Sequence, residues 1–205
     1  MATETVKVKV PLGMRKSYFA PFAPDTPEPD NTHPIYGEVL DMGAAVKGYL
    51  SITTASGNIP GDDKILFYDE KFVSAQLDVE TTKSDLELNA AVFGHKYADG
   101  LETSGKDDSS PYGGYGFIEP ILMQNKKIVY RAGFFYKLTA MQSSEKTEAD
   151  TRKNDFSPKM NAVSFFVQED NTGAWRERKE FDTEAAADEW LKGIFAGTTA
   201  AAGTA

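Results

Sequence analysis

The alternation of apolar and polar positions is clearest between residues 130 and 141, and it returns between residues 160 and 169. Because successive side chains of a strand point to opposite sides of a sheet, this pattern predicts two β-strands. One predicted face of the first strand is mixed, since Arg131 and Lys137 share it with Phe135. A sheet face in contact with water is normally polar, so the mixed face needs a cover. The other face, predicted to be buried, consists of Tyr130, Ala132, Phe134, Tyr136, Leu138 and Ala140.

Weaker alternation predicts further strands, and one segment changes its period. Residues 84–94 alternate at first and adopt a helical spacing after Asn89. Pro120 lies inside a predicted strand, where its missing N–H favours an edge position or a bulge. The other predicted strands span residues 5–10, 45–54, 64–69, 72–81, 115–124 and 174–181.

A helical spacing of apolar residues between positions 182 and 196 predicts an α-helix. Asp182 or Thr183 can cap its N-terminus, and Gly197 is suited to end it. The apolar stripe consists of Ala187, Trp190, Leu191, Ile194 and Phe195. With roughly seven to nine strands beside it, the chain is predicted to be mainly β, a sandwich or barrel with one flanking C-terminal helix.

The connections between these elements suggest a division of the chain. Residues 1–34 contain five closely spaced prolines and are predicted to be an extended N-terminal arm. Residues 35–197 form the predicted domain, and the small residues of 198–205 form a flexible tail. The segments 54–64 and 98–112 are rich in Gly, Pro, Ser and Asp and are predicted to be long loops.

Composition and charge narrow the possible partners. The chain has 205 residues, 40% hydrophobic residues, no cysteine and a net charge of −9. The negative charge is concentrated between residues 21 and 130, and such an acidic body repels a phosphate backbone instead of gripping it. The sequence shows neither a signal peptide nor a stretch of roughly 18 apolar residues, so no membrane partner is expected.

The sequence shows no recognisable catalytic or metal-binding motif. Its two histidines, His33 and His95, have no metal-ligand spacing, and neither accompanies a nucleophile motif. The acidic pairs at 62–63 and 107–108 do not fit a calcium-binding loop. We therefore expect no enzymatic activity, no cofactor and no metal.

Several segments, taken in order, resemble the major tail protein family of long-tailed bacteriophages, the proteins that build the tail tube. The resemblance begins with "PIYGEVLDMGAAVKGYLSI" and "FVSAQLDVETTKSDLELNAAVFG". It continues through "YGGYGFIEPI", "YRAGFFYKLTAMQ" and an acidic connection containing "FSP". It ends with "FDTEAAADEWLKGIF", which is similar to the closing helix of the family, so that it covers about residues 34–197.

This resemblance implies a structural virion protein. Its subunits would form hexameric rings in which strands join one continuous inner barrel, and the rings would stack into a tube through loops and arms. Phage DNA would pass through the lumen during genome ejection without specific binding. The implied partners are the chain itself and other tail proteins: the tape measure, tail terminator and distal tail proteins. The implied location is the virion tail, with assembly in the host cytoplasm.

The resemblance also suggests roles for particular residues. In a tube, the polar face of the most amphipathic strand, 72–81, would line the lumen together with a neighbouring strand. Contacts between subunits would involve the arm, the two loops and the mixed face of 130–141. The lumen-facing candidates are Ser51, Thr53, Gln76, Asp78 and Glu80, and the inter-subunit candidates are Phe19, Phe22, Arg131, Phe135 and Lys137.

A monomeric β-sandwich binding module of a virion, recognising a carbohydrate or a receptor, is the alternative. Such a module usually presents an aromatic platform or a metal site at its loop ends. Here the loops are acidic and contain few aromatic residues apart from Tyr112 and Tyr115. The two functions differ in assembly, because a binding module remains small at high concentration.

Overall fold

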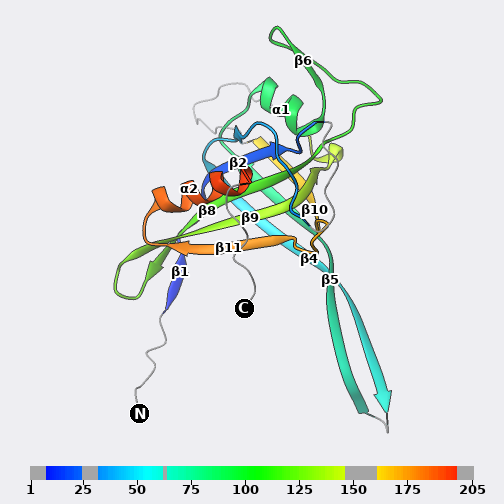
Figure 1. Cartoon of the computed structure of the whole chain (residues 1–205), viewed down its shortest axis with the longest axis vertical. Helices are drawn as coiled ribbons and strands as arrows, with labels where there is room; N and C mark the ends of the chain where they lie inside the picture. Colours follow the sequence, from blue (N-terminus) through cyan, green and yellow to red (C-terminus); the bar gives the residue numbers. More distant parts are fainter. Residues whose placement is uncertain (1–7, 25–31, 62–63, 146–160, 198–205) are drawn as a thin grey trace, which may run out of the picture.

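A computed structural model of the chain describes residues 8–24, 32–61, 64–145 and 161–197. One nine-stranded antiparallel sheet dominates it, in the order β3-β2-β8-β9-β10-β5-β4, with β1 also beside β8 and β11 beside β9 (Figure 1). The strands of the sheet are β1 (Lys9–Pro11), β2 (Arg15–Pro21), β3 (Leu40–Asp41), β4 (Ala45–Gly61), β5 (Lys64–Thr81), β8 (Tyr112–Met123), β9 (Ile128–Ala140), β10 (Asn161–Gln168) and β11 (Arg176–Phe181). The remaining elements are the helices α1 (Leu86–Phe93) and α2 (Glu184–Phe195), the short hairpin β6 (Lys96–Ala98) and β7 (Leu101–Thr103), and the 3-10 helix η1 (Gln142–Ser144). The predicted mainly β, sandwich-like fold with a C-terminal helix is confirmed, as an open sheet and not a closed barrel.

The sheet folds over on itself around an inner cluster of apolar side chains. Phe19 of β2 and Phe165 of β10 stack with ring centroids 5.8 Å apart, and Tyr115 of β8 lies 5.7 Å from Phe165. In a flat sheet β2 and β10 would be about 14 Å apart, three strand spacings, so this contact requires strong curvature. The two halves of the sheet, β2-β8-β9 and β10-β5-β4, therefore face each other across one core. The inner cluster consists of Phe19, Met42, Ala75, Leu77, Val79, Leu88, Val92, Phe93, Tyr115, Phe135, Leu138, Ala140, Val163, Phe165 and Val167.

Helix α2 covers the outer face of the β2-β8-β9 half. Thr183 caps its N-terminus by accepting a hydrogen bond from the Ala186 N–H, as predicted, and Gly197 follows its last turn with φ of +66°. All five residues of the predicted apolar stripe are buried. They pack against the outer side of the sheet in a helix-facing cluster of Tyr18, Ala20, Tyr36, Ile118, Ala132, Phe134, Tyr136, Ala187, Trp190, Leu191, Ile194 and Phe195.

A buried carboxylate fastens this helix to β2. Asp188 accepts a hydrogen bond from the Tyr18 hydroxyl at 2.7 Å, and it pairs with Lys16 at 3.1 Å and Lys192 at 2.9 Å. Burial alone would raise the pKa of Asp188, but the hydrogen bonds from Lys192, Tyr18 and Lys16 outweigh it and lower that pKa. The ionised carboxylate is thus the form that the fold favours.

Strand β9 is covered on both faces within the chain, which explains its mixed composition. Opposite β8 its register shifts, because Tyr115 pairs with Phe135 but Gly113 pairs with Leu138. This bulge reverses the alternation, so Leu138 and Ala140 join Phe135 in the inner cluster. The prediction that all six alternate residues from 130 to 140 share one face is therefore wrong beyond the bulge.

Pro120 lies where β8 exchanges one neighbouring strand for another. On one side β8 pairs with β2 as far as Ile118 and with β1 from Ile121 onward. Between them, the Pro120 carbonyl accepts a hydrogen bond from the Leu12 N–H at 2.9 Å. Strand β8 is therefore an interior strand and not the predicted edge, and Pro120 lies at the position where β2 is replaced by β1 as its neighbour.

Part of the predicted N-terminal arm belongs to the domain itself. Residues 15–21 form β2, and Ser17, Tyr18, Phe19 and Ala20 are all buried there. Apolar side chains on both sides of β2 draw it into the sheet, between the inner cluster and α2. Residues 1–7 and 25–31 of the predicted arm lie outside the described residues.

Three local predictions are wrong. The predicted loop at 54–64 is largely strand, because β4 and β5 continue pairing to Gly61 and Lys64, and bulges absorb irregular positions such as Pro60. The predicted strand start at 84–89 is α1, whose N-cap is Asp85. Part of the predicted loop at 98–112 pairs as β6 and β7. Strand pairing in the first and third cases, and helix capping by Asp85 in the second, outweighed the preference that the local sequence suggested.

Candidate functional site

The five lumen-facing candidates share one face of the β4-β5 ribbon, hereafter the polar face. The register places Ser51 beside Gln76 and Thr53 beside Ser74. Tyr49 lies beside Asp78, and Lys47 beside Glu80. Because directly paired residues of antiparallel strands point to the same side, the predicted grouping of Ser51, Thr53, Gln76, Asp78 and Glu80 is correct.

The reverse side of β5 belongs to the inner cluster, where Ala75, Leu77 and Val79 are nearly completely buried. The alternation of 72–81 places Val73 on this side too, but it is 53% exposed. A register shift between Thr53 and Thr54, directly across the ribbon, interrupts the alternation there. The amphipathic part of β5 therefore begins after this bulge.

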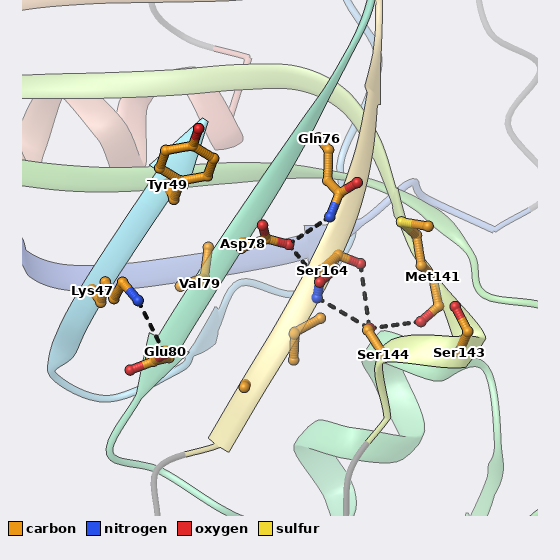
Figure 2. Close-up of a pocket in the computed structure, with 12 residues that line it drawn as sticks. Lys47, Tyr49, Gln76, Asp78, Val79, Glu80, Met141, Ser143, Ser144 and Ser164 are labelled. Atoms are coloured by element: carbon orange, nitrogen blue, oxygen red, sulfur yellow. Dashed lines mark hydrogen bonds and ion pairs between the residues drawn. The ribbon is translucent and has the colours of Figure 1, made fainter. Parts of the chain in front are cut away.

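Hydrogen bonds order the polar face (Figure 2). The Gln76 amide donates to Asp78 Oδ1 at 2.9 Å, and the Ser164 hydroxyl of β10 donates to the same oxygen at 2.5 Å. Beside them, Ser144 Oγ accepts from the Ser164 N–H at 3.0 Å and donates to the Met141 carbonyl at 2.6 Å. Asp78 is thereby fixed at the centre of the face.

The charge of this face is smaller than the sequence alone suggested. Lys47 Nζ lies 3.8 Å from Glu80 Oε1, so one base accompanies the two acids, Asp78 and Glu80. Lys47, Tyr49 and Ser164 were not among the predicted site residues, although alternation in 45–54 puts Lys47 and Tyr49 on the same side as Ser51 and Thr53. What the sequence could not supply was the pairing of β10 with β5.

A shallow hollow of about 540 Å³ lies on the same face, between β4, β5, β10 and the segment of η1. Its described lining offers hydroxyl, amide, carboxylate and ammonium groups and includes no histidine or cysteine. Such a surface can exchange hydrogen bonds with water or with a polar polymer, but its described lining contains no nucleophile–base pair. The lining residues are Lys47, Tyr49, Gln76, Asp78, Val79, Glu80, Met141, Ser143, Ser144, Ala162, Val163 and Ser164.

The five inter-subunit candidates do not lie together. Phe19 is 0% and Phe135 1% exposed within the single chain, so their prediction as subunit contacts is wrong. Both side chains fill the inner cluster that the folded sheet encloses. Phe22, Arg131 and Lys137 are partly buried, and their assembly role stays a prediction.

Arg131 and Lys137 already have intramolecular contacts. Arg131 pairs with Glu119 at 3.2 Å and with Glu180 at 2.8 Å. Lys137 Nζ lies 5.1 Å above the Tyr112 ring. Exposed charges and rings of this kind are compatible with a surface that is solvated in the free chain.

Six of the seventeen large apolar residues that are exposed in the described chain lie on the β4-β5 hairpin. The hairpin projects far beyond the rest of the fold (Figure 1). In the described residues β4 is paired with β5 alone, so its other edge has unpaired backbone groups. The large apolar residues exposed along the hairpin are Val46, Tyr49, Ile52, Phe67, Tyr68 and Val73.

Comparison of the chain with protein-family models and with curated proteins found no match. None of the described helices is long and apolar enough to cross a membrane.

Proposed function

We propose that the chain is a self-assembling structural subunit of a bacteriophage tail tube, in which hexameric rings stack around a DNA-conducting lumen. The observation that carries the proposal is that the two outer faces of the folded sheet differ. Helix α2 covers one outer side of the folded sheet, whereas in the described chain only the short η1 segment borders the polar face on the β10-β5-β4 half. A ring subunit needs this asymmetry, with a solvated wall facing inward and a helix placed away from it.

The long edge of β4 supports growth of the sheet from one copy to the next. Along its 17 residues, the N–H and C=O groups that point away from β5 have no strand partner in the described chain, and Tyr49 is 61% and Ile52 47% exposed. A long apolar edge of this kind favours pairing with another chain, and ring closure removes such edges. The neighbouring copy is therefore the proposed cover for β4.

The projecting hairpin supports contact beyond the neighbouring strand. Phe67 is 71% and Tyr68 64% exposed, at a distance from either apolar cluster. Large aromatic side chains typically supply the buried centre of protein interfaces. We assign the hairpin to contacts between subunits or between rings.

The polar face suits a wall past which DNA slides. Asp78 and Glu80 outnumber Lys47, so each copy contributes excess negative charge, and a ring repeats it. Its serine, threonine and glutamine side chains add no positive charge, so they do not supply the electrostatic attraction on which DNA affinity depends. DNA is in this proposal a transient, non-specific passenger.

Assembly of the purified protein tests the proposal. Wild-type protein, concentrated alone or with tail-initiation components, should give rings or tubes in negative-stain microscopy and a fast-sedimenting species. Ile52→Lys should abolish them because it places a charge on the β4 edge, whereas Leu86→Lys, at an exposed apolar position of α1, should assemble normally. Persistent wild-type monomer under all conditions would refute the proposal. Normal tubes from Ile52→Lys would refute the edge contact alone.

A monomeric binding module is the second candidate, favoured by the hollow on the polar face. Tyr49 beside carboxylate and amide groups is a combination that can bind a sugar ring. In that case the wild-type protein would remain monomeric, and Tyr49→Ala would abolish binding on a glycan array without changing sedimentation. The two candidates thus predict different outcomes for one preparation.

A further inference from the structure

A second polar cluster lies away from the polar face, at the end of the molecule that holds α1 and the β6-β7 hairpin (Figure 1). His95 follows the Gly94 C-cap of α1, and its side chain is only 3% exposed. Glu102 of β7 lies 2.8 Å from His95 Nδ1, and Glu145 lies 3.8 Å from His95 Nε2. Residues from three separate segments therefore converge around one buried imidazole.

The geometry of the two carboxylates differs. The Glu102 contact is a hydrogen bond that fixes the ring, and Ser104 Oγ lies 3.3 Å from the same nitrogen. The Glu145 contact is too long for a hydrogen bond, but a metal ion about 2.1 Å from each atom fits between a nitrogen and an oxygen 3.8 Å apart. A carboxylate on the second nitrogen is the usual support of a metal-binding histidine.

The fold holds these groups in place. Gln142 of η1 donates a hydrogen bond to the Phe93 carbonyl at 2.6 Å, which ties the segment ending at Glu145 to the end of α1. The Phe93 and His95 rings stack with centroids 5.9 Å apart. One nitrogen or oxygen ligand atom from each of His95, Glu102 and Glu145 lies within 4.8 Å of the other two. His95 Nε2 and Glu145 are therefore placed to share an ion, while Glu102 holds the imidazole from its other nitrogen.

The charge balance also points to a cation. The side-chain ion pairs described for Glu102 and Glu145 are both with His95, so even a protonated imidazole leaves an excess negative charge. Glu102 is 13% exposed and Glu145 34%, so solvent compensates Glu102 poorly.

We propose that His95 Nε2 and Glu145 bind a divalent transition-metal ion, with Glu102 holding the imidazole through Nδ1 and water completing the coordination, and Zn²⁺ is the best match to an imidazole and a carboxylate ligand. The site would bind the β6-β7 hairpin to the end of η1 and so stiffen this end of the molecule. A nitrogen ligand disfavours Ca²⁺ and Mg²⁺, which prefer all-oxygen sites. This inference is independent of tube assembly.

Calorimetric titration of tag-free, chelator-treated full-length protein with Zn²⁺ tests the site. We expect one Zn²⁺ per chain, an affinity reduced at least about tenfold in His95→Gln, and little heat with Ca²⁺. The matched control is His33→Gln, which should leave Zn²⁺ binding unchanged. His33 is the other histidine of the chain, and it stacks on Tyr136 and contacts Asp170.

A second variant keeps the test decisive if His95→Gln fails to fold, which circular dichroism would reveal. Glu145→Gln alters the most exposed member of the cluster and should weaken Zn²⁺ binding at least about tenfold while preserving the fold. No saturable Zn²⁺ binding by the wild type, or wild-type affinity in a folded His95→Gln or Glu145→Gln variant, would overturn the proposal.

Discussion

Truncation of Phe19 separates its two possible roles, core residue or subunit contact. The side chain is 0% exposed and stacks on Phe165 at 5.8 Å. Phe19→Ala removes the ring from between the two halves of the sheet and leaves a cavity that the surrounding strands can fill only partly. Buried Phe→Ala changes cost about 3–5 kcal/mol, and complete burial places Phe19 toward the upper end of this range.

The measurement is urea unfolding of dilute protein, followed by far-ultraviolet circular dichroism. Phe67→Ala is the matched control, because the same side chain is 71% exposed on the hairpin and should change the free energy of unfolding by less than about 0.5 kcal/mol. Phe67→Ala should instead reduce assembly. A loss below about 1 kcal/mol for Phe19→Ala would refute the packing of β2 against β10 described here.

Three other predictions concern charge and backbone geometry. Asp188→Asn should make the free energy of unfolding less dependent on pH in the acid range. The pKa of Asp188 is lowered in the folded chain, so its ionised form contributes stability above the ordinary carboxyl pKa of about 3.9, and this contribution is lost as pH falls through the folded-state pKa. Urea unfolding at a series of pH values from neutral to acid would measure the difference between the variant and the wild type. Joint replacement of Asp78 and Glu80 by Lys should permit assembly but slow genome ejection, most strongly at low salt, because cationic rings bind phosphates. Normal ejection at both low and moderate salt would place these residues outside the lumen. Gly94→Ala should lower the free energy of unfolding by at least about 1 kcal/mol in thermal or urea unfolding. The φ angle of Gly94 is +78°, and an added Cβ would lie 2.1 Å from the Ser109 carbonyl oxygen. An unchanged free energy of unfolding would contradict this backbone conformation after α1.

Local signals were sufficient where one residue or one periodicity decides the structure. The stripe from Ala187 to Phe195 and the Thr183 cap predicted α2 because helix formation and capping depend on residues within a few positions of one another. Alternation likewise predicted the polar and buried sides of β5 between residues 74 and 80, where the pleat continues without a bulge. The sequence by itself therefore determined the mainly β class, the C-terminal helix and the polar side of β5.

Tertiary structure decided what depends on strand partners. The bulge in β9 moved Leu138 and Ala140 to the other face, and curvature of the sheet placed Phe19 against Phe165, across a separation of more than 140 residues. The cluster of His95, Glu102 and Glu145 was likewise invisible in the sequence, because no standard spacing joins its members and three segments must fold together to form it. Periodicity reports which side of a strand is apolar, but pairing, register and curvature determine which distant residues meet there.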